Sequence, residues 1–151
     1  MSRGRKKPYE KKAFESDGMR SDTSANIYMS MLLSKAWRDL SPQQQRLYLY
    51  CKAQYYAEKR KPLGDSLCFT MNQSKWSSLY GLYERSNARG FYRDMAALMD
   101  HGFVECLVSG RATRTKNIYR FSSAWTAFGT EDFQLPEPLS EPLSEMHVSL
   151  A

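Results

Sequence analysis

The period of the apolar residues changes from that of a helix to that of a strand within residues 86–108, which read SNARGFYRDMAALMDHGFVECLV. The first part predicts a helix that is capped by Ser86 or Asn87, ends near His101 and has Gly102 just beyond its end. Apolar residues at spacings of three and four form its expected buried stripe, namely Ala88, Phe91, Tyr92, Met95, Leu98 and Met99. The remaining arc is expected to face solvent and holds Asn87, Arg89, Gly90, Arg93, Asp94 and Asp100.

A β-hairpin is predicted directly after this helix. Residues 103–108 and 117–121 each follow a period of two, which is typical of strands. Between them, residues 109–116 are polar and basic and contain a glycine, which indicates an enlarged hairpin tip. Trp125 follows the hairpin and is expected to fold back on the core.

Before the capped helix, the sequence predicts two further helices in its first half. Residues 34–40 have the pattern of a short helix. Ser41 and Pro42 then begin a longer helix that runs to about Arg60, because serine caps a helix well and proline suits the first helical position.

Residues 68–71 are predicted to be a short extended piece. A further helix is expected over residues 73–80, capped by Asn72 or Ser74. Three of its side chains are expected to be buried, namely Trp76, Leu79 and Tyr80.

The 151 residues suffice for one domain, which we place at residues 27–128, between a basic arm at 1–26 and an acidic, proline-containing tail at 129–151. The net charge is +6, but residues 21–128 alone hold fifteen basic and eight acidic side chains. The tail holds five acidic side chains, no Lys or Arg, and a repeat of Glu-Pro-Leu-Ser at 137–144. A basic body suggests a polyanion as partner.

Several function classes are disfavoured by what the sequence lacks. Cys51, Cys68 and Cys106 form no CxxC pair, and the two histidines supply no zinc-finger spacing, so we expect neither a metal nor another cofactor. No phosphate loop, HExxH or Ser-His-Asp order is present, so the chain is not expected to be an enzyme. No apolar run has the length of a membrane helix and no secretory signal opens the chain, which predicts a cytoplasmic protein without a membrane partner.

The order of helix, extended piece, helix, turn, helix and hairpin resembles that of winged helix-turn-helix proteins. The expected fold class is therefore α+β, with about three to four helices and a C-terminal β-hairpin wing. A narrower resemblance, over residues 27–126, is to small winged-helix proteins of bacterial conjugative transposons and plasmids, related to replication initiators. It rests on Trp76-(x6)-Tyr83, Asn87-(x3)-Phe91-Tyr92-Arg93-Asp94-Met95, His101-Gly102-Phe103, and Asn117-Ile118-Tyr119-Arg120-Phe121-Ser122-(x2)-Trp125.

In such a fold the helix after residue 87 is the recognition helix, whose first turn meets base edges in the major groove. Ser86, Asn87, Arg89 and Arg93 are therefore the expected base-reading residues, since Arg reads guanine and Asn reads adenine through paired hydrogen bonds. The alternative is a solvated helix face, with Arg89 paired to Glu84.

Further cations are expected to contact the phosphate backbone. In the wing these are Arg111, Arg114 and Lys116. Outside it they are Lys75 and the arm residues Arg3, Arg5, Lys6 and Lys7. The alternatives are a polar turn, an unpaired surface lysine and a solvated tail.

The sequence thus favours sequence-specific binding of double-stranded DNA, as a transcriptional regulator or a replication accessory of a bacterial mobile element. A homodimer and association with the nucleoid are compatible expectations. Two rival interpretations remain open. One is a winged-helix module for protein–protein interaction in a larger assembly, and the other is an RNA or single-strand binder that uses its many aromatic residues.

Overall fold

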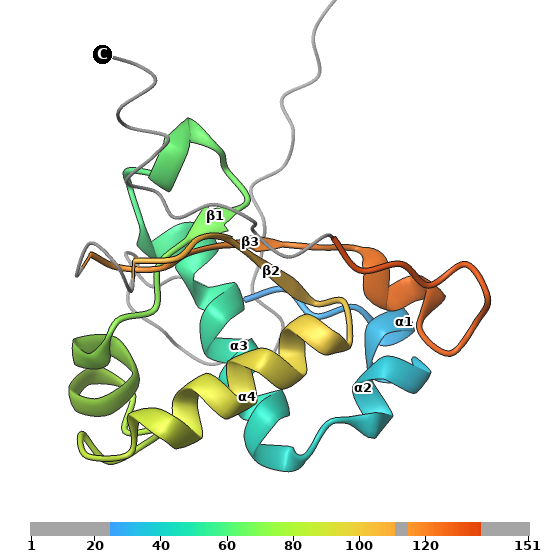
Figure 1. The fold of residues 1–151 in the computed structure, drawn as a ribbon, viewed down its shortest axis with the longest axis horizontal. Helices are drawn as coiled ribbons and strands as arrows, with labels where there is room; N and C mark the ends of the chain where they lie inside the picture. The colour runs from blue at the N-terminus through green and yellow to red at the C-terminus, as the bar shows by residue number, and fades with distance from the viewer. Residues whose placement is uncertain (1–24, 111–114, 137–151) are drawn as a thin grey trace, which may run out of the picture.

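A three-stranded antiparallel sheet crosses the helices in the computed structural model, which describes residues 25–110 and 115–136 (Figure 1). The strands are β1 (Cys68–Phe69), β2 (Val104–Val108) and β3 (Ile118–Phe121), and they lie in the order β1-β3-β2. β2 and β3 pair as the predicted hairpin, with an irregularity in register between Cys106 and Val108. The coarse class is therefore mixed helix and strand, as expected.

The helices are α1 (Met29–Leu32), α2 (Lys35–Asp39), α3 (Pro42–Ala57), the π-helix η2 (Ser74–Leu79) and α4 (Ala88–Asp100). Two short 3₁₀ turns complete the described elements, η1 (Pro62–Gly64) and η3 (Ala124–Ala127). α3 and α4 pack against each other on the same side of the sheet, where α3 contacts β1 and α4 contacts β2 (Figure 1). No helix within the described part of the chain has the length and apolarity needed to cross a membrane.

Serine side chains cap the first turns of α2 and α3, and Ser41 is the predicted cap of α3. The Ser34 hydroxyl accepts a hydrogen bond from the Trp37 amide at the start of α2. At α3, Ser41 and Gln44 form a reciprocal capping box in which each side chain bonds the other residue's backbone amide. These bonds satisfy amide groups that the first turn of a helix leaves without partners.

α3 ends at Ala57, three residues before the predicted end near Arg60. The chain leaves the helix at Glu58, whose carboxylate accepts hydrogen bonds from the Thr70 amide and hydroxyl. The Lys61 ammonium then donates to the carbonyls of Gln54 and Tyr55, which lie in the last turn of the helix. Contacts from beyond the helix therefore set its end.

The core is largely aromatic. Phe103 lies at its centre, with its ring centroid 5.1 Å from that of Tyr48 and 5.9 Å from that of Trp37. Trp125 stacks on the same Phe103 ring at 6.0 Å, so the prediction that it folds back is confirmed. A second cluster contains Trp76, which stacks on the Phe91 ring of α4 at 5.1 Å.

Two residues of α4 that were predicted to face solvent are buried, and one predicted to be buried is exposed. Asp94 is 2% exposed and Gly90 is also buried, whereas Tyr92 is 54% exposed. The Asp94 carboxylate accepts a hydrogen bond from the Tyr83 hydroxyl at 2.7 Å and one from the Gln44 amide at 3.3 Å. Because these bonds turn Asp94 inward, Tyr92, about 200° away around the helix, must turn outward.

The prediction for residues 73–80 was wrong at Leu79, which is 69% exposed, although Trp76 is buried as expected. This segment is a π-helix, in which the Tyr80 amide bonds to the Lys75 carbonyl five residues back. The wider turn rotates Leu79 away from the face that buries Trp76. Of the two proposed caps, Asn72 is used, since its side chain accepts from the Lys75 amide at 3.0 Å.

The Asp94 network leads to a stability prediction. Asp94→Ala should lower the free energy of unfolding by about 1–3 kcal/mol for each donor left unpaired, because the Tyr83 hydroxyl and the Gln44 amide lose a buried acceptor. Tyr83→Phe should cost less, because it removes a single bond. The measurement is urea denaturation of both variants and the parent. A loss below about 0.5 kcal/mol for Asp94→Ala would mean that the carboxylate does not hold α4 in place.

Gly102 closes α4 in a left-handed conformation with φ of +82°, and the Phe103 amide bonds back to the Leu98 carbonyl. A Cβ at this position would lie 2.6 Å from the Trp125 nitrogen, so Gly102→Ala should destabilise the fold well beyond the conformational cost. Gly81 also has a positive φ, but a Cβ there meets nothing within 4 Å.

Gly81→Ala is therefore the matched control and should cost only the left-handed strain of about 1–2 kcal/mol. Thermal denaturation followed by circular dichroism compares the two variants. If Gly102→Ala and Gly81→Ala lose equal stability, the structure relieves the contact with Trp125 without a loss of free energy.

Candidate nucleic-acid interface

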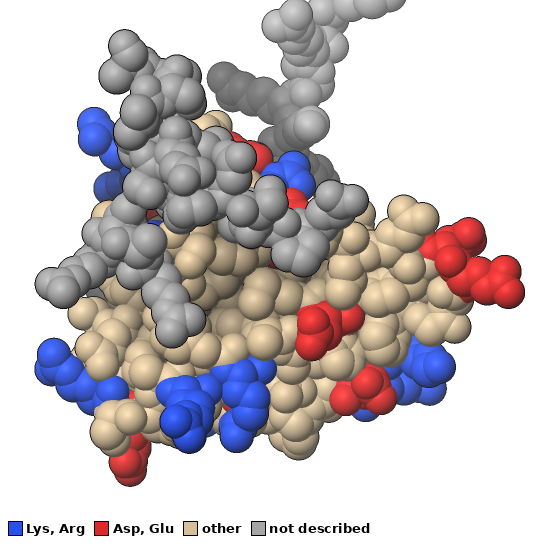
Figure 2. All heavy atoms as spheres, in the orientation of Figure 1, with Lys and Arg blue, Asp and Glu red and all other residues tan. Residues whose placement is uncertain are grey.

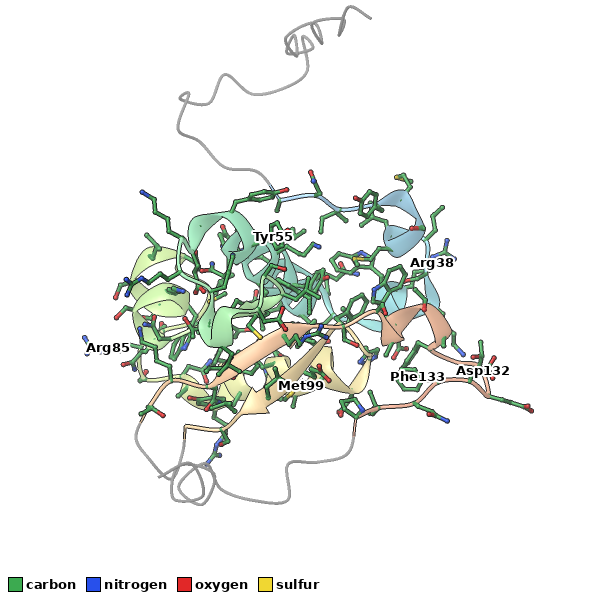
Figure 3. The ribbon with its side chains drawn as sticks, turned by 90° about the horizontal axis from the view of Figure 1, so that it is seen from above. Arg38, Tyr55, Arg85, Met99, Asp132 and Phe133 are labelled. Carbon is green, nitrogen blue, oxygen red and sulfur yellow. The ribbon has the colours of Figure 1, made fainter. Side chains whose placement is uncertain are left out.

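The first half of α4 presents a face of exposed cations. Arg89 and Arg93 lie one turn apart on this helix, and both are exposed as predicted. Arg85, in the turn before the helix, is exposed as well and points away from the body of the molecule (Figure 3). Figure 2 shows Lys and Arg side chains gathered along the lower left edge, over the start of α4.

Only one of these three cations has an ion-pair partner within the described chain. Arg93 has a contact with the buried Asp94 at 3.4 Å, but its own side chain is 73% exposed. Neither Arg85 nor Arg89 pairs with a carboxylate among residues 25–110 and 115–136, so the considered pair of Arg89 with Glu84 is not formed there. The face therefore carries positive charge that is open to an anion.

Sequence reasoning missed two residues of this face. Tyr92 was assigned to the buried stripe, but its ring is exposed, about 60° from Arg89 around α4. Arg85 precedes the predicted cap, so it was left outside the predicted helix and was not considered with Arg89. Its position four residues before Arg89 was the available signal.

Asn87 serves as the cap of α4. Its side-chain oxygen accepts a hydrogen bond from the Gly90 amide at 3.0 Å, and a Cβ on Gly90 would lie 2.6 Å from the Asn87 side chain. This bond uses the group that adenine recognition also requires, since reading adenine takes both the oxygen and the nitrogen of the amide. Asn87 therefore shapes the start of the helix, next to the exposed Ser86.

Lys75 lies apart from this face. Its ammonium contacts the Glu58 carboxylate at 2.5 Å and donates to the Thr70 carbonyl at 3.0 Å, and its side chain is only 22% exposed. These bonds tie η2 to the segment after α3 and to the end of β1. With its charge compensated inside the fold, Lys75 is poorly placed for the phosphate contact that the sequence suggested.

Arg120 shows the same compensation on the sheet. Its guanidinium lies 3.0 Å from Asp65 and 3.6 Å from Glu105, which faces it across β2 and β3. A hydrogen bond from the Leu67 amide and the bonds with Arg120 hold the pKa of Asp65 below its usual value. Arg120 is therefore compensated within the sheet, whereas Arg85 and Arg89 form no ion pair among the described residues.

The loop between β2 and β3 contributes one described cation. Lys116 is exposed, while Arg111 and Arg114 lie outside the described residues, as do Arg3, Arg5, Lys6 and Lys7 of the arm. At the loop end of β2 and β3, the Gly110 amide donates to the Asn117 side chain at 2.7 Å, and that side chain donates to the Tyr119 hydroxyl at 3.1 Å. This end of β2 and β3 lies at the same end of the molecule as the start of α4 (Figure 1).

The cysteines and His101 are part of the packing. Cys51 is fully buried, and this burial raises the pKa of its thiol. His101 bonds to the Ala97 carbonyl and to Asp39, and its ring stacks on Phe128 at 4.8 Å. In the described ranges, no group of three or more His, Cys, Asp or Glu residues is arranged to hold a metal ion.

Comparison with known proteins gives no relative that could identify the chain. No protein-family model, no curated protein and no solved structure matches it.

Proposed function

We propose that this chain binds duplex DNA as a winged helix, with α4 as the recognition helix and the β2–β3 hairpin as the wing. The single observation that carries this proposal is the exposed cluster of Arg85, Arg89 and Arg93 at the start of α4, in which Arg85 and Arg89 form no ion pair among the described residues. The element order supports it, because β1, η2, α4 and the hairpin follow one another as in a winged helix-turn-helix.

In the proposed complex, the first half of α4 enters the major groove. Arg89 and Arg93 project from it and can read guanine through two parallel hydrogen bonds each. The Tyr92 hydroxyl, on the same exposed side, suits a phosphate oxygen, and Arg85 suits the phosphates that flank the helix start. Lys116, in the hairpin loop, would contact the phosphate backbone of the DNA.

The biological role belongs to the same proposal. The resemblance to small winged-helix proteins of bacterial mobile elements suggests transcriptional regulation or assistance in replication of such an element. Association with the nucleoid and formation of a homodimer on a symmetric site fit this role.

The first test removes one base-reading side chain. Arg89→Ala should weaken binding to a selected duplex site by about 1–3 kcal/mol and relax the preference at one base pair, because a bidentate contact is lost. Arg38→Ala is the control, since Arg38 is also exposed but lies on α2, far from Arg85 (Figure 3). Fluorescence anisotropy titrations against the selected and a scrambled duplex measure both effects.

The two variants must keep the parent's circular dichroism spectrum. If Arg89→Ala then binds both duplexes as the parent does, α4 is not the reading face. The rival interpretation, a winged-helix module that binds a protein partner, would then lead.

The second test concerns the hairpin. Lys116→Ala should weaken binding to all duplexes about equally and reduce the slope of log K against log salt by about 1, because a phosphate contact releases counterions but reads no sequence. Lys35→Ala, at an exposed lysine of α2, should leave the slope unchanged. If the Lys116→Ala variant has the same salt dependence of binding as the parent, Lys116 does not contact the DNA.

A further inference from the structure

A hollow of about 230 Å³ lies on a face that the proposed duplex contact does not use. Its lining includes three tyrosines and one cation, with Tyr28, Lys52, Tyr55, Tyr56, Leu67 and Phe121 as the main residues. Figure 3 places Tyr55 near the first described residues of the chain, apart from both Arg85 and Met99 of α4. The hollow is therefore distinct from the cationic face of α4.

Lys52 gives the hollow a positive charge without a counter-ion. Its ammonium lies 5.2 Å from the centroid of the Phe121 ring, and partial burial lowers the pKa of this group. No carboxylate of the described residues forms an ion pair with it. A carboxylate bound here would face a cation that has already lost part of its water.

The tyrosines give the hollow an apolar rim. Tyr28 is 67% exposed and Tyr56 is 51% exposed, and the Tyr56 ring lies edge-on to Tyr55 at 4.7 Å. Exposed aromatic rings with hydroxyl groups are typical of surfaces that bind another chain. The volume is smaller than the about 300–1,000 Å³ of common small-molecule pockets, so a few side chains of a peptide fit it better than a cofactor does.

The chain itself contains a segment with the complementary chemistry. Residues 137–145 read EPLSEPLSE and carry three glutamates, two prolines, two leucines and no cation. Extended proline-containing peptides bind grooves lined with aromatic side chains, because their backbone loses little entropy on binding. The glutamates match the charge of Lys52.

The length of this segment is sufficient for contact in cis. The described chain ends at Pro136, and the nine following residues span about 30 Å when extended. A domain of about 100 residues has a radius of gyration of about 13 Å, so its width is comparable with this length. The last residues of the segment, from Leu143 to Glu145, are therefore the ones expected to reach the hollow.

We propose that residues 137–145 dock in this hollow, with a glutamate beside Lys52 and proline and leucine side chains against the tyrosines. The acidic segment is then held away from α4 and does not compete with DNA for its arginines. This interaction needs no nucleic acid, so its test is independent of the proposed duplex binding.

The test is nuclear magnetic resonance on the full-length chain without DNA. The expected result is a set of nuclear Overhauser effects between the Leu139 or Leu143 methyl groups and the Tyr28, Tyr55 or Tyr56 rings. Lys52→Glu should abolish them. Combining it with lysine substitutions at Glu137, Glu141 and Glu145 should restore them, because the charges are then exchanged across the contact. Lys59→Glu is the matched control, since Lys59 is exposed but does not line the hollow.

Lys52→Met is a second variant that keeps an unbranched side chain beside Phe121 and should also weaken the effects. Unchanged resonances of the buried Leu98 and Tyr119 verify folding in every variant. The proposal is overturned if the parent shows no such effects, or if they persist in Lys52→Glu. Effects that grow with protein concentration would also overturn it, because the segment would then come from a second copy.

Discussion

The buried carboxylate of Asp94 determines how α4 is oriented in this fold. Its hydrogen bonds reach the Tyr83 hydroxyl before α4 and the Gln44 side chain at the start of α3. With about 100° between successive helical residues, an inward Asp94 places Arg89 about 140° away and Tyr92 on nearly the opposite side. The inward-facing Asp94 and the buried Phe91, Met95 and Leu98 together leave the cationic face exposed. Burial, together with this hydrogen bond to Asp94, raises the pKa of Tyr83 and keeps its hydroxyl protonated as the donor.

Much of the secondary structure can be predicted from signals between residues that are close in the sequence. The span of α4, the hairpin and the start of α3 depend on apolar period, capping residues and glycine, all within a few positions of one another. The burial of Asp94 could not be predicted in this way, because Gln44 lies fifty positions before it and a charged residue on a polar arc normally faces solvent. The π-winding that exposes Leu79 has no comparable signal in the sequence.

The residues of the candidate interface also differ in whether local sequence predicts their exposure. Arg89 and Arg93 were predictable because helical spacing alone places them on one exposed side. Lys75 was not, because its partner Glu58 lies seventeen residues earlier and only the folded chain brings the two together. A count of basic residues therefore overstates the charge available to a polyanion, since Lys75 and Arg120 are compensated within the fold. Arg85 and Arg89, at the start of α4, are among the exposed cations that form no ion pair in the described part of the chain.

The close contact between Asn87 and Gly90 has a consequence for how this sequence can vary. Any side chain at position 90 would occupy the space of the capping amide, and losing that cap leaves the first-turn amides without their partner. A change at position 90 alone therefore costs both a clash and a hydrogen bond, whereas a shorter cap such as serine at position 87 makes room. Among descendants of this chain, the two positions should be inherited as a pair. Arg89, which lies between them but is exposed, is not subject to this constraint.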